Sequence, residues 1–173
     1  MLIALTGTPG TGKTTVAALL PYPVIDLNSM VKEDGYNLGW DSERGCLEAD
    51  MDRLEKRLSG METEDIKDLT ILEGHFSHYF ADETIVLRLA PSQLKERLLT
   101  RGYSDLKIQE NLEAEAIDVV LIEVVEFCSR VDEIDTTGKS PTQVADIIVK
   151  VLNREIEQKP GQVDWLEDYL DLK

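Results

Sequence analysis

Short apolar runs alternate along the chain with longer stretches in which apolar residues recur every three or four positions. A short apolar run is typical of a buried strand, and the longer spacing is typical of a helix with one buried face. This alternation predicts an α/β fold, in which helices cover a five-stranded parallel sheet to form a three-layer sandwich. The predicted strands are residues 1–6, 24–27, 69–73, 84–89 and 131–135.

Start and stop signals bound several of the predicted helices. Pro91 begins one helix and Gly102 ends it, while Ser140 opens another with a capping box. Ser29 is predicted to cap the helix that follows the second strand. Further helices are predicted at residues 14–20, 47–58 and 105–128, with a short amphipathic helix around residues 165–170 that docks on the core.

The predicted helix 105–128 has two faces of different character. Its apolar stripe has helical spacing, so it is predicted to lie in the core; the stripe includes Ile117, Leu121, Val124 and Phe127. Its acidic face is predicted to be solvated and consists of Glu110, Glu113, Glu115 and Asp118.

The chain also leaves this regular pattern once. Residues 35–45 are polar and aromatic, with glycines at both ends and at Gly39. Such a stretch is typical of an excursion from the core, where a substrate flap would lie.

The stretch GTPGTGKTT at residues 7–15 fits the phosphate-binding motif G-x-x-x-x-G-K-[ST]. It lies between a predicted strand and a predicted helix, which is the context that the motif requires. Its glycines let backbone N–H groups approach phosphate oxygens, and the helix N-terminus adds a positive dipole. Lys13 is predicted to contact the β- and γ-phosphates of ATP and the Thr14 hydroxyl to bind Mg²⁺. The alternative is a glycine-rich turn without a ligand.

A carboxylate ends the third predicted strand, at Glu73 in the stretch EGHFSH. A carboxylate buried there would be costly unless it served a cation or a donor, so Glu73 is predicted to hold Mg²⁺. The alternative is an exposed strand end. His75 could orient a water or a phosphate or carry a proton, and it could equally be structural. His78 is a weaker candidate for such a role.

Two arginines, Arg97 and Arg101, lie four residues apart and therefore share one face of a predicted helix. They would repel each other unless an anion lay against them, and guanidinium groups suit phosphate or a nucleobase. We therefore expect both to contact the ligand, with a solvated charged face as the alternative. Residues 100–110 are predicted to close over the phosphates as a short lid, and backbone groups of 136–139 to contact adenine.

At 173 residues the chain is expected to form one domain. Its formal net charge of −16 and pI near 4.4 disfavour binding to bulk nucleic acid and would attract basic partners, although solubility or salt adaptation explains the charge equally well.

No run reaches membrane-spanning length, and no signal peptide is indicated. Cys46 and Cys128 indicate neither a disulfide framework nor a zinc site. A cytoplasmic protein is expected.

With these motifs the chain resembles nucleoside monophosphate kinases, and more narrowly the adenylate kinase isoenzyme six family, whose archaeal members are labelled "putative adenylate kinase". The resemblance runs from the phosphate-binding loop to the helix ending near Asn153. Three stretches make it specific, namely DGYNLGWDSERGCLEADMDRL at 34–54, EGHFSH at 73–78 and LKERLLTRGYSDLKIQENL at 94–112.

The resemblance implies a set of site residues. The implied ATP-binding residues are Gly10, Gly12, Lys13, Thr14, Thr15 and, in the lid, Arg101, and the implied acidic and histidine pair is Glu73 and His75. The family often has aspartate at the position of Glu73, and the arginine of the Asp-Gly-Phe-Pro-Arg stretch in ordinary adenylate kinases is missing here. The charge of the monophosphate must therefore be met elsewhere in residues 28–53, for which the candidates are Asn28, Lys32 and Arg53.

The resemblance also implies a function. A single P-loop kinase domain would span residues 1–173 and transfer the γ-phosphoryl group of Mg·ATP to AMP, with Lys13, Glu73, His75 and Arg101 as catalytic residues. The family is further associated with maturation of small-subunit ribosomal RNA and with a basic ribosomal protein. An ATP-hydrolysing ribosome assembly factor is therefore the alternative function, and a kinase for a small metabolite is a weaker one.

Overall fold

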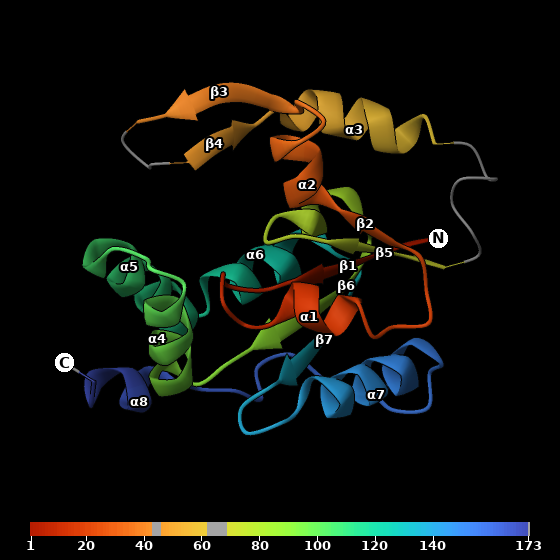
Figure 1. Ribbon diagram of the computed structural model, residues 1–173. Coiled ribbons are helices and arrows are strands. Elements are labelled where there is room, and N and C mark those ends of the chain that lie inside the picture. Colours follow the sequence, from red (N-terminus) through yellow and green to blue (C-terminus); the bar gives the residue numbers. More distant parts are fainter. Residues whose placement is uncertain (43–45, 62–68, 173) are drawn as a thin grey trace.

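A five-stranded parallel sheet forms the centre of the computed structural model (Figure 1), which describes residues 1–42, 46–61 and 69–172. The strand order is β2-β5-β1-β6-β7, so the first strand of the chain lies in the middle of the sheet. The strands are β1 (Leu2–Thr6), β2 (Val24–Asp26), β5 (Thr70–Glu73), β6 (Glu83–Arg88) and β7 (Arg130–Asp135). This sheet confirms the predicted fold class.

Helices cover both faces of the sheet, as the alternation of side chains along β6 shows. Ile85 and Leu87 point into a core that also includes residues of α1 (Lys13–Ala17) and α7 (Pro141–Leu152). Val86 points the other way and packs with residues of α6 (Val119–Phe127). Successive side chains of a strand face opposite sides, so α6 lies across the sheet from α1 and α7. Figure 1 shows these three layers.

Residues 27–42 and 46–61 lie above the β2 edge of the sheet, opposite α7 in Figure 1. The helix α2 (Leu27–Lys32) begins after Asp26, whose Oδ1 accepts hydrogen bonds from the amides of Asn28 at 2.8 Å and Ser29 at 3.1 Å. The prediction that Ser29 is the N-cap was therefore wrong, because the carboxylate of Asp26 reaches these amides first.

An antiparallel hairpin, β3 (Asn37–Asp41) and β4 (Cys46–Ala49), follows α2 and precedes α3 (Met51–Ser59). The predicted helix 47–58 was wrong at its start, since residues 47–49 pair with β3 and α3 begins only after its N-cap Asp50. Gly45, part of the predicted excursion, lies outside the described residues.

The predicted helix 105–128 is two helices, α5 (Asp105–Ala116) and α6. The chain breaks at Asp118, which has a left-handed φ of +60°. Of the predicted stripe, Leu121 and Val124 are buried, whereas Ile117 and Phe127 are 51% and 60% exposed. The break turns α6 away from the line of α5, so one continuous buried stripe is no longer possible.

The remaining helices are short or follow prediction closely. A 3₁₀ helix, η1 (Ser77–Phe80), follows β5, and α4 (Pro91–Thr100) runs between Pro91 and Gly102 as expected. The capping box of Ser140 and Gln143 opens α7. The tail docks on its own core through α8 (Leu166–Leu170), whose Tyr169 is buried among residues of α4 and α5. Among the described residues, no helix has the length and apolar character needed to span a bilayer.

Candidate nucleotide-binding site

The phosphate-binding loop, residues 7–12, connects the central strand β1 to α1. Gly7 and Gly10 have φ values of +137° and +103°, in the left-handed region that other residues rarely adopt. A Cβ on Gly10 would lie 2.6 Å from Leu94 Cδ1, and one on Gly7 would overlap the carbonyl oxygen of Leu87. The sequence therefore needs glycine here because the loop passes directly over β6 and α4.

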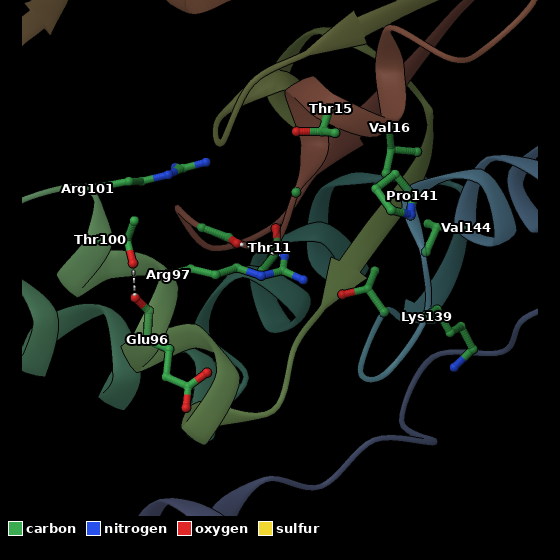
Figure 2. Close-up of a pocket in the computed structure, with 13 residues that line it drawn as sticks. Thr11, Thr15, Val16, Glu96, Arg97, Thr100, Arg101, Lys139, Pro141 and Val144 are labelled. Carbon is green, nitrogen blue, oxygen red and sulfur yellow. Dashed lines mark hydrogen bonds between the residues drawn. The ribbon is translucent and has the colours of Figure 1, made fainter.

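A cavity of about 450 Å³ opens beside this loop (Figure 2). Three segments that are far apart in sequence form its walls, namely the loop with α1, the C-terminal half of α4, and the segment that leads into α7. The residues that line it are Gly10, Thr11, Gly12, Thr15, Val16, Glu96, Arg97, Thr100, Arg101, Thr136, Lys139, Pro141 and Val144. Its size and its place beside the loop suit a nucleotide.

Lys13 is the first residue of α1 and is only 7% exposed. Its Nζ donates hydrogen bonds to the carbonyl oxygens of Gly7 at 2.7 Å and Thr8 at 3.1 Å. Burial lowers the pKa of Lys13 to about 8, although the carboxylates of Glu73 and Glu115 act in the opposite direction. A phosphate group would favour the charged lysine, so the site is prepared for an anion.

Thr14 and Glu73 bring a hydroxyl and a carboxylate together across the end of the sheet. Thr14 Oγ1 lies 3.3 Å from each carboxylate oxygen of Glu73. Glu73 is 1% exposed, so the alternative of a strand end in solvent was wrong. Burial raises the pKa of Glu73, while Lys13 opposes that rise. Hydroxyl and carboxylate oxygens are the ligands that Mg²⁺ prefers, and these two fit that ion.

The two histidines after β5 have different surroundings. His75 is exposed, its ring meets Phe76 edge-on at 4.8 Å, and its backbone carbonyl accepts a hydrogen bond from Thr6. The partial withdrawal of the ring from water lowers the pKa of His75 to about 4, helped by the charge of Lys13. The ring is therefore neutral at neutral pH and can accept or donate a hydrogen bond.

His78, by contrast, is 2% exposed. Its Nδ1 lies 3.4 Å from Thr6 Oγ1, and its Nε2 lies 3.5 Å from a carboxylate oxygen of Glu123. Burial lowers the pKa of His78. The ring is packed between β1 and α6, and these surroundings fit a structural role for His78.

Arg97 and Arg101 both extend from α4 toward the phosphate-binding loop, as Figure 2 shows. Arg97 Nη1 donates to the carbonyl oxygen of Gly10 at 3.3 Å. Arg101 lies at the C-terminal end of α4 and is exposed. The structure therefore brings both guanidinium groups to one wall of the cavity, beside Thr15 and the start of α1.

The three candidates for the monophosphate lie outside the cavity, on α2 and α3. Arg53 is held by its own segment, because its Nη1 donates to the carbonyl oxygen of Gly35 at 3.0 Å and its guanidinium lies 5.1 Å from the ring centre of Tyr36. The backbone N–H of Asn28 donates to Asp26, and Lys32 is exposed at the end of α2.

Sequence reasoning missed two groups of residues here. Thr11, Glu96, Thr100, Pro141 and Val144 line the cavity, and only the fold shows that the segments carrying them meet. A second group, centred on the buried Arg88, carries charge behind the loop. One signal was available for it, since an arginine within the apolar run TIVLRL requires a buried partner.

A phosphate-binding loop at the end of the central strand of a parallel sheet, with a cavity beside it, defines a P-loop α/β fold. In solved structures, the shikimate kinases from Acinetobacter baumannii and Bacteroides thetaiotaomicron have the same fold. The first has a TM-score of 0.57 at 18% identity and covers 89% of this chain and 93% of its own. The second has a TM-score of 0.54 at 19% identity and covers 88% and 98%.

Sequence comparison defines the family more closely. Residues 3–118 match the family model described as "AAA domain". The "Putative adenylate kinase" of Methanosarcina barkeri is 46% identical over 96% of this chain and 98% of its own, and that of Methanothermobacter thermautotrophicus is 45% identical over 95% and 96%. The chain belongs to this family of archaeal proteins.

Proposed function

We propose that this protein is a nucleoside monophosphate kinase that transfers the γ-phosphoryl group of Mg·ATP to AMP, and that it belongs to the isoenzyme six branch of adenylate kinases. The observation that carries the proposal is the arrangement of Lys13, Thr14 and the buried Glu73 around one end of the phosphate-binding loop. The name "Putative adenylate kinase" of the archaeal relatives supports AMP as the acceptor.

In the proposed reaction, an oxygen of the AMP phosphate forms a bond to the γ-phosphorus of ATP. The bond between that phosphorus and the β–γ bridging oxygen breaks, and both products are ADP. Such a transfer is mostly a matter of positioning and charge neutralisation. The loop amides and Lys13 hold the donor, and Thr14 and Glu73 hold the Mg²⁺ that accompanies it and neutralises phosphate charge.

The two arginines of α4 suit the transferring group. Arg97 and Arg101 extend from the same helix into the cavity, where their charge would stabilise the developing negative charge. Residues 100–110 act as the lid, and closure over the phosphates would exclude water and so favour transfer over hydrolysis. Residues 28–53, which follow the C-terminal end of β2 beside Glu73, supply the acceptor site.

The experiment measures ADP and inorganic phosphate from Mg·ATP on one purified sample, with and without AMP. We expect ADP to rise with AMP while little phosphate is released. Phosphate release that AMP does not change would contradict the kinase proposal. Transfer to a small metabolite, with none to AMP, would favour the weaker alternative.

A second function, ATP hydrolysis during assembly of the small ribosomal subunit and maturation of its RNA, is favoured by two observations. His75 is exposed and neutral two residues after Glu73, where it could position a water molecule. The net charge of −16 suits a basic ribosomal protein as partner. Both activities can reside in one protein.

His75→Ala tests whether the two activities separate. We expect it to lower ATP hydrolysis about tenfold or more while transfer to AMP stays near the wild-type rate, because transfer needs no positioned water. The measurement is ADP and phosphate formation by both proteins at pH 7.5. Equal loss of both activities would show that His75 does not separate them.

A further inference from the structure

A buried cluster of charges lies behind the phosphate-binding loop, at the C-terminal end of β6. Arg88 is 2% exposed, and it meets the carboxylates of Glu115, Glu133 and Asp118. Its Nε donates to Glu115 Oε1 at 2.8 Å, its Nη1 donates to Glu133 Oε1 at 2.5 Å, and its Nη2 donates to Asp118. Glu115 and Glu133 are each 2% exposed, so the acidic face predicted to be solvated is partly core.

Burial opposes the charge of Arg88, but Glu115 and Asp118 outweigh it and raise the pKa of the guanidinium. The cluster also contacts the break between α5 and α6. Arg88 Nη2 donates to the backbone carbonyl of Glu115 at 2.8 Å, and the same carbonyl accepts from the amide of Asp118 at 3.4 Å. The left-handed Asp118 then turns its carboxylate back toward the same guanidinium.

One contact joins this cluster to the phosphate-binding loop. Thr8, the second residue of the motif, is 1% exposed, and its hydroxyl donates to Glu115 Oε2. The other oxygen of Glu115 accepts from Arg88 and from the amide of Leu89, the latter at 3.0 Å. Both carboxylate oxygens are therefore used, and the carboxylate cannot turn without breaking a contact on β6.

The backbone carbonyl of Thr8 also accepts the hydrogen bonds that hold the inside of the loop together. Its carbonyl oxygen accepts from Lys13 Nζ at 3.1 Å, from the amide of Thr11 at 3.2 Å and from Thr11 Oγ1 at 2.9 Å. The side chain of Thr8 thus faces the buried charges while its carbonyl faces the phosphate-binding lysine. A shift of Thr8 would move the carbonyl that orients Lys13.

We propose that Glu115, held by Arg88, is a positioning residue that fixes the phosphate-binding loop and Lys13 through Thr8. Through its contact with Thr8, Glu115 connects the loop to the C-terminal end of α5, the helix that includes part of the lid. The inference rests on the proposed function only in taking Mg·ATP as the donor substrate. AMP is proposed to bind at residues 28–53, which are not part of this chain of contacts.

The test compares Thr8→Val with Thr8→Ser. Valine keeps the shape of threonine and loses the hydroxyl, while serine keeps the hydroxyl and loses the methyl group. We expect Thr8→Val to weaken Mg·ATP binding and to raise the KM for Mg·ATP about tenfold, and Thr8→Ser to bind within about twofold of wild type. The KM for AMP should not change. Thr84→Val, at an equally buried threonine that contacts Cys128 instead, is the matched control.

Binding is measured by calorimetry with Mg·ATP alone, at a temperature where circular dichroism shows each variant folded. This keeps the inference separate from the proposed function, because a protein that does not phosphorylate AMP still gives a dissociation constant for Mg·ATP. Wild-type binding by Thr8→Val would overturn the inference, as would an equal loss in Thr84→Val.

A double variant tests whether Glu115 acts through Thr8. Glu115→Gln keeps an oxygen for Arg88 but loses the charge that holds the hydroxyl of Thr8. We expect it to weaken Mg·ATP binding alone, and to add less than twofold when Thr8→Val is already present. Additive losses would mean that the two residues act independently and would overturn the positioning role.

Discussion

Replacing Lys13 with alanine is expected to lower ADP formation from Mg·ATP and AMP by about a thousandfold or more. The side chain is buried within the loop, so its charge acts on the phosphates in a site where water screens poorly. Hydrolysis of ATP should fall in parallel, since both reactions use the same donor. The control is Lys150→Ala, which removes an exposed lysine from α7 and should leave the rate within about twofold.

Proton uptake gives a second measurement on the same variant. The pKa of Lys13 is lowered to about 8, so at pH 8.5 the lysine of the free protein is largely neutral. Bound phosphates favour the charged form and raise that pKa, so Mg·ATP binding should take up as much as about one proton at pH 8.5 and much less at pH 6.5. Calorimetry in two buffers of different ionisation enthalpy measures this, and Lys13→Ala should show no such uptake. Equal uptake by the variant would contradict the position assigned to Lys13.

The parts of this molecule that were predictable are those fixed by local chemistry. The motif at residues 7–15 requires glycine where the backbone is left-handed, and the apolar runs require burial, so the loop and the sheet followed from the sequence. The burial of Glu73 was predictable for a related reason. A carboxylate that ends a buried strand needs a partner, and Thr14 and Lys13 lie beside it.

The parts that were not predictable depend on contacts between distant segments. Residues 47–49 have a helical apolar pattern, but pairing with β3 outweighs it and makes them a strand. Residues 105–128 read as one helix because nothing local breaks it. The break lies at Asp118, and both Glu115 and Asp118 there contact Arg88, which is 27 residues away from Glu115 in sequence.

Arg88 also carries the largest expected effect on stability. Arg88→Met is expected to lower the free energy of unfolding by about 3–5 kcal/mol, because it leaves buried carboxylates without their cation. Urea unfolding followed by circular dichroism measures the change. Arg154→Met is the control, since Arg154 pairs with Glu83 through side chains that are 44% and 25% exposed, and it should cost about 1 kcal/mol or less.

A second variant shows whether uncompensated charge is the cause. In the Arg88→Met background, Glu115→Gln removes one of the charges left unpaired, so we expect it to restore part of the lost stability. In the wild-type background the same substitution removes a partner of Arg88 and should destabilise. This change of sign is what a charge cluster requires, because each charge is tolerated only while the opposite charge is present. If Glu115→Gln destabilised both backgrounds equally, Arg88 would act through its packing volume instead of its charge.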